Sequence, residues 1–418
     1  MKKLAVNGGN TLNGKIDLQG SKNSALPIIS ACVAVNGVCV IHNCPKLTDI
    51  ESSLRILEHI GCKVKREGNS VTVDSTTANS WRIPEEMMRE MRSSIVFMGA
   101  LLTRFAFASV TSPGGCEIGL RPIDLHLSAL REMGVCVNEN GGNLECSAPF
   151  GISGCRISLA FPSVGATENV ILASVCAKGE TVITNAAREP EIADLASFLN
   201  KCGAKISGAG QSVIRIQGVS SLMGAEHRII PDRIVASTHM AFVAAAGGKI
   251  AVDGVCAEHI APIVPVFESA GCLVNVKNSE LIIGAPKKLL RVKCIRTMPY
   301  PGFPTDSQAL VMAMLTKAEG TSIISERIFE NRFRHVPELI KMGADIRVEN
   351  NCVAVVEGVE KLHGARVSAT DLRGGCALLV AALGAEGKTF IEDIHHIDRG
   401  FECAEHTLGM LGADIKRE

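Results

Sequence analysis

The sequence repeats one pattern six times: an amphipathic helix ends at a glycine, and a short strand follows. The helices are expected at residues 54–60, 127–133, 195–202, 264–270, 336–342 and 408–411. The glycines that end them are Gly61, Gly134, Gly203, Gly271, Gly343 and Gly412. A glycine directly after a helix is typical of a left-handed C-cap. Six similar units are therefore the simplest organisation of this chain.

Each unit also contains an earlier helix that is apolar nearly all round. These runs are residues 25–35, 95–102, 170–177, 240–246, 309–315 and 377–383. A helix without a polar face must be buried, whereas an amphipathic helix can cover the outside. A small turn and an alternating strand such as residues 181–184 follow the buried helix. The pattern predicts a mixed α/β (α+β) fold with sheets packed around central helices.

The chain of 418 residues is too long for one ordinary core and indicates two or three domains. The sixth unit stops one strand short of the others, and residues 4–6 can supply that strand. The predicted domains are therefore 22–229, and 1–21 together with 230–418. The chain would cross between them near residues 20 and 230, which are natural hinge positions.

Composition excludes several classes of function. Lys plus Arg equals Asp plus Glu, 43 against 43, and aromatic residues make up only 4%, so nucleic acid is not an expected partner. No apolar run reaches the roughly 18 residues of a membrane span, and the N-terminus lacks the apolar run of a signal peptide. Sixteen cysteines without ligand-like spacing indicate a reducing compartment and no metal site. We therefore expect a cytoplasmic protein.

Several cations lie at or just before the buried helices, among them Lys22, Arg92 and Arg373. A cation at a helix N-terminus opposes the helix dipole unless an anion lies between them. Together with Arg121 and Arg399, these residues predict a cleft for a substrate with several phosphates or carboxylates. The Ser, Thr, Asn and Asp residues nearby have an alternative role as helix caps.

Two residues suit proton transfer. Cys116 lies in the glycine-rich segment 112–126, where a neighbouring cation such as Arg121 would favour the thiolate. The alternative is a surface turn that happens to hold a cysteine. Asp306 follows a proline-rich lead-in at a helix start, and we interpret it as a proton acceptor. Its alternative role is a helix cap.

With these motifs the chain resembles the UDP-N-acetylglucosamine 1-carboxyvinyltransferases, the enolpyruvyl transferases of peptidoglycan precursor synthesis. The resemblance covers essentially the whole chain. The motifs that carry it lie at residues 20–23, 113–126, 162–167, 188–192, 231–234, 303–306, 329–333, 371–373 and 396–400. It implies two pseudo-threefold domains, each an inside-out α/β barrel, hinged around an active-site cleft.

The resemblance also implies the reaction and its residues. An enolpyruvyl group would pass from phosphoenolpyruvate to the 3'-hydroxyl of UDP-N-acetylglucosamine, and phosphate would be released. Cys116 would act as general acid, form a covalent adduct and react with fosfomycin, while Asp306 would take the hydroxyl proton. Phosphoenolpyruvate would contact Lys22, Asn23, Arg121, Arg373 and Arg399. The nucleotide sugar would contact Asn23, Arg92, Arg121, Pro122, Ile123, Asp124, Leu125, Ser163, Val164, Gly165, Asp306 and Ile328. No cofactor or metal is implied, and we expect a monomer.

The sequence departs from the family at two positions and leaves two rival interpretations. The family commonly has Glu and Gly where this chain has Val235 and Ser237, close to the second domain crossing. One rival is 5-enolpyruvylshikimate-3-phosphate synthase, which the Cys116 segment and residues 163–165 disfavour. The other is a non-catalytic repeat scaffold, which leaves the arginines and Asp306 unexplained.

Overall fold

The chain divides into two compact units in the computed structural model, which describes residues 2–111 and 123–418, the side chain of Arg92 excepted. The middle unit comprises the described residues from Gly20 to Ile230. The terminal unit comprises the N-terminal residues through Gln19 and the residues from Pro231 to Glu418. Each unit has its own hydrophobic core.

The described strands form six sheets, three in each unit. In the middle unit the strand orders are β13-β3-β5-β4, β6-β8-β7 and β11-β12-β10-β9. Its strands are β3 (Val38–His42), β4 (Lys63–Glu67), β5 (Ser70–Asp74), β6 (Phe107–Thr111), β7 (Cys136–Asn140), β8 (Asn143–Ser147), β9 (Arg156–Ser158), β10 (Glu180–Thr184), β11 (Lys205–Ser207), β12 (Val213–Gln217) and β13 (Glu226–Arg228).

In the terminal unit the strand orders are β15-β16-β14-β2, β17-β18-β20-β19 and β21-β22-β1-β23. Its strands are β1 (Leu4–Asn7), β2 (Leu12–Asp17), β14 (Gly248–Asp253), β15 (Leu273–Lys277), β16 (Glu280–Gly284), β17 (Cys294–Arg296), β18 (Thr321–Ser325), β19 (Asp345–Glu349), β20 (Val353–Glu357), β21 (Arg366–Ser368), β22 (Lys388–Glu392) and β23 (Asp414–Arg417). One sheet for each repeat confirms the predicted mixed α/β fold of six repeats.

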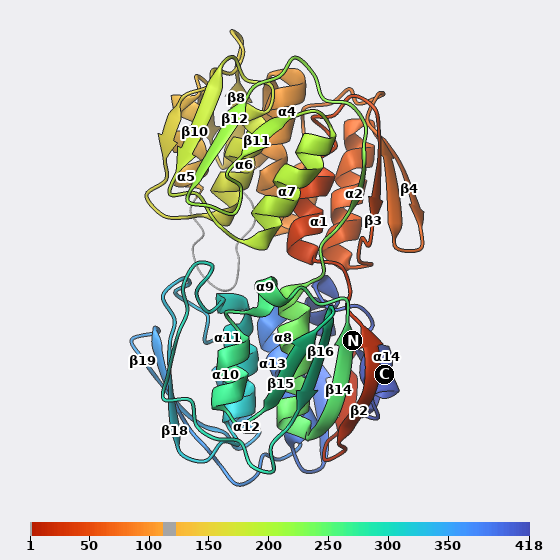
Figure 1. Ribbon diagram of the computed structural model, residues 1–418, viewed down its shortest axis with the longest axis vertical. Helices are drawn as coiled ribbons and strands as arrows, with labels where there is room; N and C mark the ends of the chain where they lie inside the picture. The colour runs from red at the N-terminus through yellow and green to blue at the C-terminus, as the bar shows by residue number, and fades with distance from the viewer. Residues whose placement is uncertain (1, 112–122) are drawn as a thin grey trace. The chain divides into compact units, whose positions relative to one another are not determined.

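Three buried helices form the centre of each unit, as the apolar runs predict. They are α1 (Lys22–Ala31), α4 (Phe97–Phe105) and α6 (Val164–Ser174) in the middle unit, and α8 (Arg233–Ala246), α11 (Thr305–Leu315) and α13 (Leu372–Gly384) in the terminal unit. In the terminal unit all three pack against one another (Figure 1). Helices α1 and α6 begin several residues before the apolar runs, because polar residues such as Lys22 and Asn169 precede those runs within the helices.

Each of the six repeats has one outer helix. The repeated glycines end these helices in the left-handed conformation, with φ between 86° and 102°. This confirms the pattern on which the repeat was predicted. The outer helices are α2 (Thr48–Ile60), α5 (Asp124–Glu132), α7 (Pro190–Lys201), α10 (Val264–Ser269), α12 (Val336–Lys341) and α14 (Ala404–Met410). Shorter helices are α3 (Glu85–Glu90), α9 (Ala257–Ile260), and the 3-10 helices η1 (Arg92–Val96) and η2 (Ile394–Arg399).

The N-terminal strand completes the last repeat, as expected. Strand β1 lies between β22 and β23 and pairs antiparallel with both. Each of the two strands that precede a crossing pairs within the unit that the chain is about to leave. Strand β2 precedes α1 but pairs with β14, and β13 precedes α8 but pairs with β3.

The two crossing segments are hydrogen-bonded to each other. The amide of Ser21 donates to the carbonyl of Ile230 at 2.8 Å, and that of Asp232 donates to Gln19 at 3.0 Å. Between them, Gly20 packs so closely that a Cβ there would lie 1.8 Å from the carbonyl oxygen of Asn43. Glycine is therefore required at this position by close approach of the backbone.

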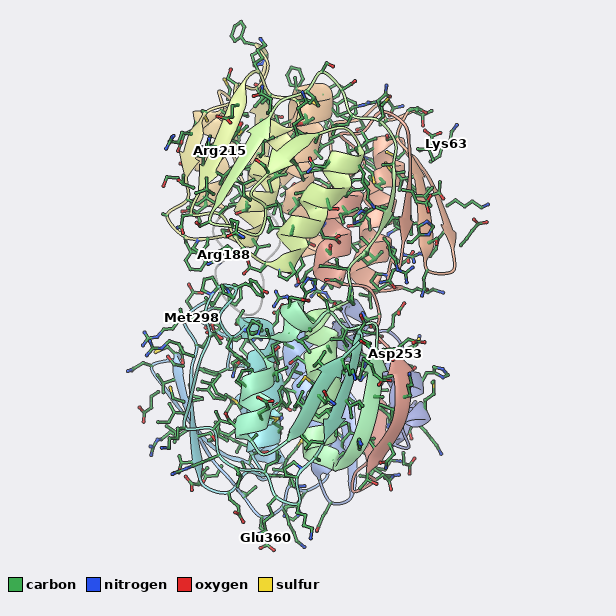
Figure 2. All side chains as sticks on the ribbon, viewed as in Figure 1. Lys63, Arg188, Arg215, Asp253, Met298 and Glu360 are labelled. Atoms are coloured by element: carbon green, nitrogen blue, oxygen red, sulfur yellow. The ribbon has the colours of Figure 1, made fainter. Side chains whose placement is uncertain are left out.

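Charged side chains lie on the outer faces of the sheets and on loops. Lys63 and Arg215 are exposed on strands of the middle unit, and Glu360 is exposed on a loop of the terminal unit (Figure 2). In the described part of the chain, no helix combines the length and apolar character needed to cross a membrane.

Candidate active site

The first turn of α1 presents Lys22 and Asn23, both predicted to bind phosphoenolpyruvate. Ser21 caps the helix by accepting a hydrogen bond from the amide of Ser24 at 3.3 Å. The ammonium of Lys22 lies 2.6 Å from the carboxylate of Asp49 on α2, and both side chains are almost completely buried. The cation at this helix start therefore already has a protein counterion, which the sequence analysis did not foresee.

The starts of α5 and α6 meet in the middle unit. Ser163 caps α6, with Val164 and Gly165 as its first residues, while Ile123 precedes Asp124 and Leu125 at the start of α5. A Cβ on Gly165 would lie 3.1 Å from the imidazole Cε1 of His126. The two segments predicted to bind the nucleotide sugar, 123–125 and 163–165, are thus brought together.

A buried asparagine ties these helix starts to the neighbouring central helix. The amide nitrogen of Asn169 lies 2.8 Å from Nδ1 of His126 and donates to the carbonyl of Ile95 at 3.0 Å. Its amide oxygen accepts from the backbone of Gly99 at 2.8 Å. The polar residues of α6 therefore fix the positions of α5, η1 and α4 around the predicted site.

In the terminal unit, Asp306 and Arg373 come together from two different central helices. Asp306 is the second residue of α11 and Arg373 is the second residue of α13. The carboxylate of Asp306 lies 3.1 Å from the guanidinium of Arg373. Asp371 caps α13 and accepts hydrogen bonds from the amides of Arg373 and Gly374.

Arg332 joins this group, although no role was assigned to it from sequence. Its guanidinium lies 2.8 Å from the other carboxylate oxygen of Asp306 and donates to the carbonyl of Thr305. Its side chain is only 3% exposed. Residues 329–333 are one of the motifs that carry the family resemblance, but periodicity gives no role for Arg332, because the segment belongs neither to a strand nor to an apolar run. Two cations on one carboxylate make strong charge-assisted hydrogen bonds and favour the anion.

The pKa values of two ionisable groups near Arg332 are shifted as well. Although burial opposes it, the guanidinium of Arg332 and the ring of His335 hold the pKa of Asp371 below its usual range. Burial lowers the pKa of His335 to about 4, so that this histidine is neutral at physiological pH.

Two further predicted residues lie in the same unit. Ile328 is half-buried, and its amide donates to the carboxylate of Glu326 at 2.7 Å. Arg399 is the last residue of η2, which packs on α13. Its neighbour Asp398 makes a two-pronged ion pair with Arg417, which orients this segment. Val235 and Ser237, the two departures from the family pattern, are buried near the start of α8.

The remaining predicted residues lie outside the described part of the chain. They are Cys116, Arg121 and Pro122, together with the side chain of Arg92. Their roles remain predictions.

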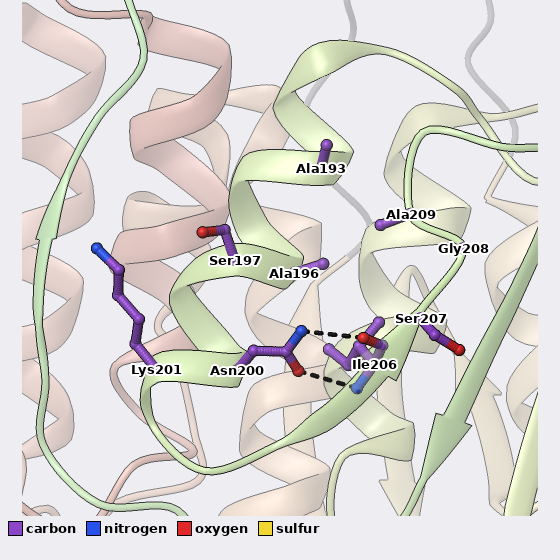
Figure 3. A pocket seen from close by; sticks show the side chains of 9 residues that line it. All are labelled: Ala193, Ala196, Ser197, Asn200, Lys201, Ile206, Ser207, Gly208 and Ala209. Atoms are coloured by element: carbon purple, nitrogen blue, oxygen red, sulfur yellow. Dashed lines mark hydrogen bonds between the residues drawn. The ribbon is translucent and has the colours of Figure 1, made fainter.

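Among the described residues, no group of three or more His, Cys, Asp or Glu side chains is arranged to hold a metal ion. An open hollow of about 590 Å³ lies between α7 and the chain from β11 to Ala209, and none of the predicted site residues that the structure describes lines it (Figure 3). The side-chain amide of Asn200 faces this hollow but is hydrogen-bonded in both directions to the backbone of Ile206. The hollow is therefore separate from the candidate site.

Comparison with known proteins identifies the family of the chain. The family model described as EPSP synthase (3-phosphoshikimate 1-carboxyvinyltransferase) matches residues 6–408. UDP-N-acetylglucosamine 1-carboxyvinyltransferase 2 of Caldanaerobacter subterraneus subsp. tengcongensis is 49% identical over 417 residues, covering 100% of both chains. UDP-N-acetylglucosamine 1-carboxyvinyltransferase of Trichlorobacter lovleyi is 46% identical, covering 100% of this chain and 99% of the relative.

A solved structure shows the same fold. The crystal structure of the enolpyruvyl transferase NikO from Streptomyces tendae superposes with a TM-score of 0.90 at 25% identity, covering 100% of this chain and 98% of that one. The resemblance inferred from the motifs is confirmed at the level of the family. The chain therefore belongs to the enolpyruvyl (1-carboxyvinyl) transferase family, among the relatives named UDP-N-acetylglucosamine 1-carboxyvinyltransferases.

Proposed function

We propose that this protein transfers the enolpyruvyl group of phosphoenolpyruvate to the 3'-hydroxyl of UDP-N-acetylglucosamine and releases inorganic phosphate. The observation that carries the proposal is full-length identity of 45–49% to relatives that bear this activity in their names. The pairing of Asp306 with Arg332 and Arg373 at two helix starts supports it, because the reaction needs a base beside anion-binding groups.

The proposed chemistry begins with protonation of the phosphoenolpyruvate methylene by Cys116. The adjacent carbon becomes electrophilic, and the sugar hydroxyl attacks it while Asp306 takes the hydroxyl proton. Return of a proton from the new methyl group to the Cys116 thiolate and departure of phosphate with the C–O bonding electrons then restore the double bond. Lys22, Asn23, Arg121, Arg373 and Arg399 are proposed to hold the anionic groups of phosphoenolpyruvate.

We propose that binding of phosphoenolpyruvate makes Asp306 a stronger base. Two guanidinium groups on a carboxylate weaken it as a base. Arg373 is also proposed to contact the substrate carboxylate, which would divide its positive charge between two anions. Proton affinity at Asp306 would then rise when phosphoenolpyruvate arrives.

We also propose that the two domains, 22–229 and 1–21 with 230–418, close over the substrates about the paired crossings at residues 19–21 and 230–232. Closure would exclude water, which competes with the sugar hydroxyl for the electrophilic carbon. A cytoplasmic location belongs to the same proposal, since every cysteine in the described part of the chain is a free thiol.

Phosphate release tests the proposed function directly. The purified chain, mixed with phosphoenolpyruvate and UDP-N-acetylglucosamine, is expected to release phosphate at a rate that depends on both compounds. Shikimate 3-phosphate serves as the control acceptor and is expected to give none. Release with shikimate 3-phosphate alone would favour the activity named by the family model, and no release with either acceptor would favour a binding scaffold.

A further inference from the structure

The loop that connects β18 to α12 holds the start of α11 at two points. At one end of the loop, Arg332 donates to the carbonyl oxygen of Thr305 and to the carboxylate of Asp306. At the other end, the carboxylate of Glu326 accepts from the hydroxyl of Thr305 at 2.8 Å. Both contacts act on the first two residues of α11, one of which is the proposed base.

The carboxylate of Glu326 has further partners on its own loop. Its Oε1 accepts from the amide of Ile328 at 2.7 Å, and from the amide of Phe329 at 3.2 Å. The same oxygen accepts from the hydroxyl of Thr297 at 2.9 Å. Glu326 is only 1% exposed. A buried carboxylate needs several donors to offset the loss of its hydration, and here backbone and side-chain groups supply them.

We infer that Glu326 is a positioning residue that holds Asp306 and Ile328 in a fixed relation to each other. Asp306 is the proposed base, and Ile328 is a proposed contact of the nucleotide sugar, so the inference rests on the proposed function. One oxygen of Glu326 sets the loop that presents Ile328, and the other sets the residue before Asp306. The acceptor and the base that deprotonates it are thereby aligned through one side chain.

A matched pair of threonine variants tests the contact between Glu326 and Thr305, the residue before Asp306. Thr305→Val removes the hydroxyl that Glu326 holds at the start of α11. Thr316→Val removes a buried hydroxyl at the other end of the same helix, where it donates to the carbonyl of Ala313 at 2.7 Å. Both variants lose one hydrogen bond, so urea unfolding midpoints are expected to fall in both, and further in Thr305→Val because its partner is the buried carboxylate of Glu326.

Their kinetics are expected to differ. Thr305→Val should lower kcat about tenfold, the loss typical of one misplaced catalytic group, and leave KM for UDP-N-acetylglucosamine within about twofold of wild type. Thr316→Val should keep both constants within about twofold. Equal kcat values in the two variants would overturn the inference, because a merely structural hydroxyl affects stability alone.

Variants of Glu326 test its contacts with Thr305 and with the amide of Ile328 together. Glu326→Gln keeps an oxygen for Ile328 and can donate to the Thr305 hydroxyl, so it should retain most activity. Glu326→Ala removes both contacts. It should lower kcat and also raise KM for UDP-N-acetylglucosamine, each by about tenfold. Wild-type constants in Glu326→Ala would also overturn the inference. If Glu326→Ala fails to fold, the threonine pair decides.

The wild-type control separates the two levels of the proposal. A wild-type chain that releases no phosphate from phosphoenolpyruvate and UDP-N-acetylglucosamine defeats the proposed function. An active wild type whose Thr305→Val and Thr316→Val variants behave alike defeats only the role of Glu326.

Discussion

At the scale of single residues, the structure explains why the helix starts tolerate so many buried charges. Lys22 faces Asp49, and Asp306 faces both Arg332 and Arg373, so each charge has a partner at hydrogen-bonding distance. A buried charge without such a partner would be strongly destabilising. The same pairs hold the groups proposed to bind and deprotonate the substrates.

Asp306→Asn tests the proposed base. The amide has the same size but cannot take a proton, so kcat is expected to fall by about 100-fold to 10,000-fold. KM for phosphoenolpyruvate should change much less, since Arg373 and the other proposed phosphoenolpyruvate contacts remain. Steady-state phosphate release measures both constants. Asp345→Asn, an exposed carboxylate on β19 of the same unit, is the matched control and should behave as wild type. Near-normal turnover in Asp306→Asn would remove it as the base.

At the scale of elements, the repeat depends on glycines that end the outer helices. Gly412 follows α14 with φ of 98°, a left-handed conformation that disfavours other residues. Three residues earlier, Gly409 lies inside the same helix, and nothing lies within 4 Å of a Cβ built there. The same substitution at these two glycines therefore acts on different parts of the backbone.

Alanine at these positions is expected to change stability in opposite directions. Gly412→Ala should lower the free energy of unfolding by about 1–2 kcal/mol, because alanine is strained in the left-handed region. Gly409→Ala should raise it by about 0.5–1 kcal/mol, because alanine loses less entropy in a helix. Urea unfolding of both variants measures the difference. A loss of the same size at both sites would contradict a role for the left-handed turn.

At the scale of the whole molecule, the two units carry buried ionisable groups of opposite effect. In the terminal unit, burial lowers the pKa of His239 to about 3 and that of His335 to about 4. In the middle unit, burial raises the pKa of Glu168 well above its usual value, and Glu191 and Glu189 add to the shift. The histidines are neutral in the folded state, whereas the folded state favours a protonated Glu168.

These shifts predict that acid destabilises the terminal unit first. Between about pH 6.5 and pH 4 the unfolded chain binds more protons at His239 and His335 than the folded chain does. In this range the free energy of unfolding should therefore decrease by about 1.4 kcal/mol for each histidine with every unit by which the pH is lowered. The sign at Glu168 is reversed, because its folded-state pKa is raised: its contribution is greatest at low pH and is lost as pH rises.

The single tryptophan and the single tyrosine separate the two units experimentally. Trp81 lies in the middle unit and Tyr300 in the terminal unit. In urea at pH 5 compared with pH 7, the midpoint read from tyrosine absorbance should fall more than that read from tryptophan fluorescence. His239→Phe, which keeps the ring contacts with Phe242 and Phe401, should reduce the acid effect. An unchanged effect in this variant would contradict the assignment.

Much of the fold could be predicted because it follows from local periodicity. Six glycines and six apolar runs predicted the outer and central helices, and the missing strand of the last repeat predicted the place of β1. Hydrophobic period and helix capping act over a few residues, so one sequence records them. The family could also be inferred, since its motifs are contiguous.

The site was only partly predictable. Lys22, Asp306 and Arg373 were found because charge at the start of an apolar helix stands out locally. Arg332 and Asp49 were not assigned, since their roles depend on partners that lie 26 positions away from one and 27 from the other. Nor does the sequence indicate that Glu326 reaches both Thr305 and Ile328. By itself the sequence determined the repeating elements, the buried helices and the family. Only the tertiary structure decided which charges meet, because ion pairs between elements form when distant segments pack together, and no local period records them.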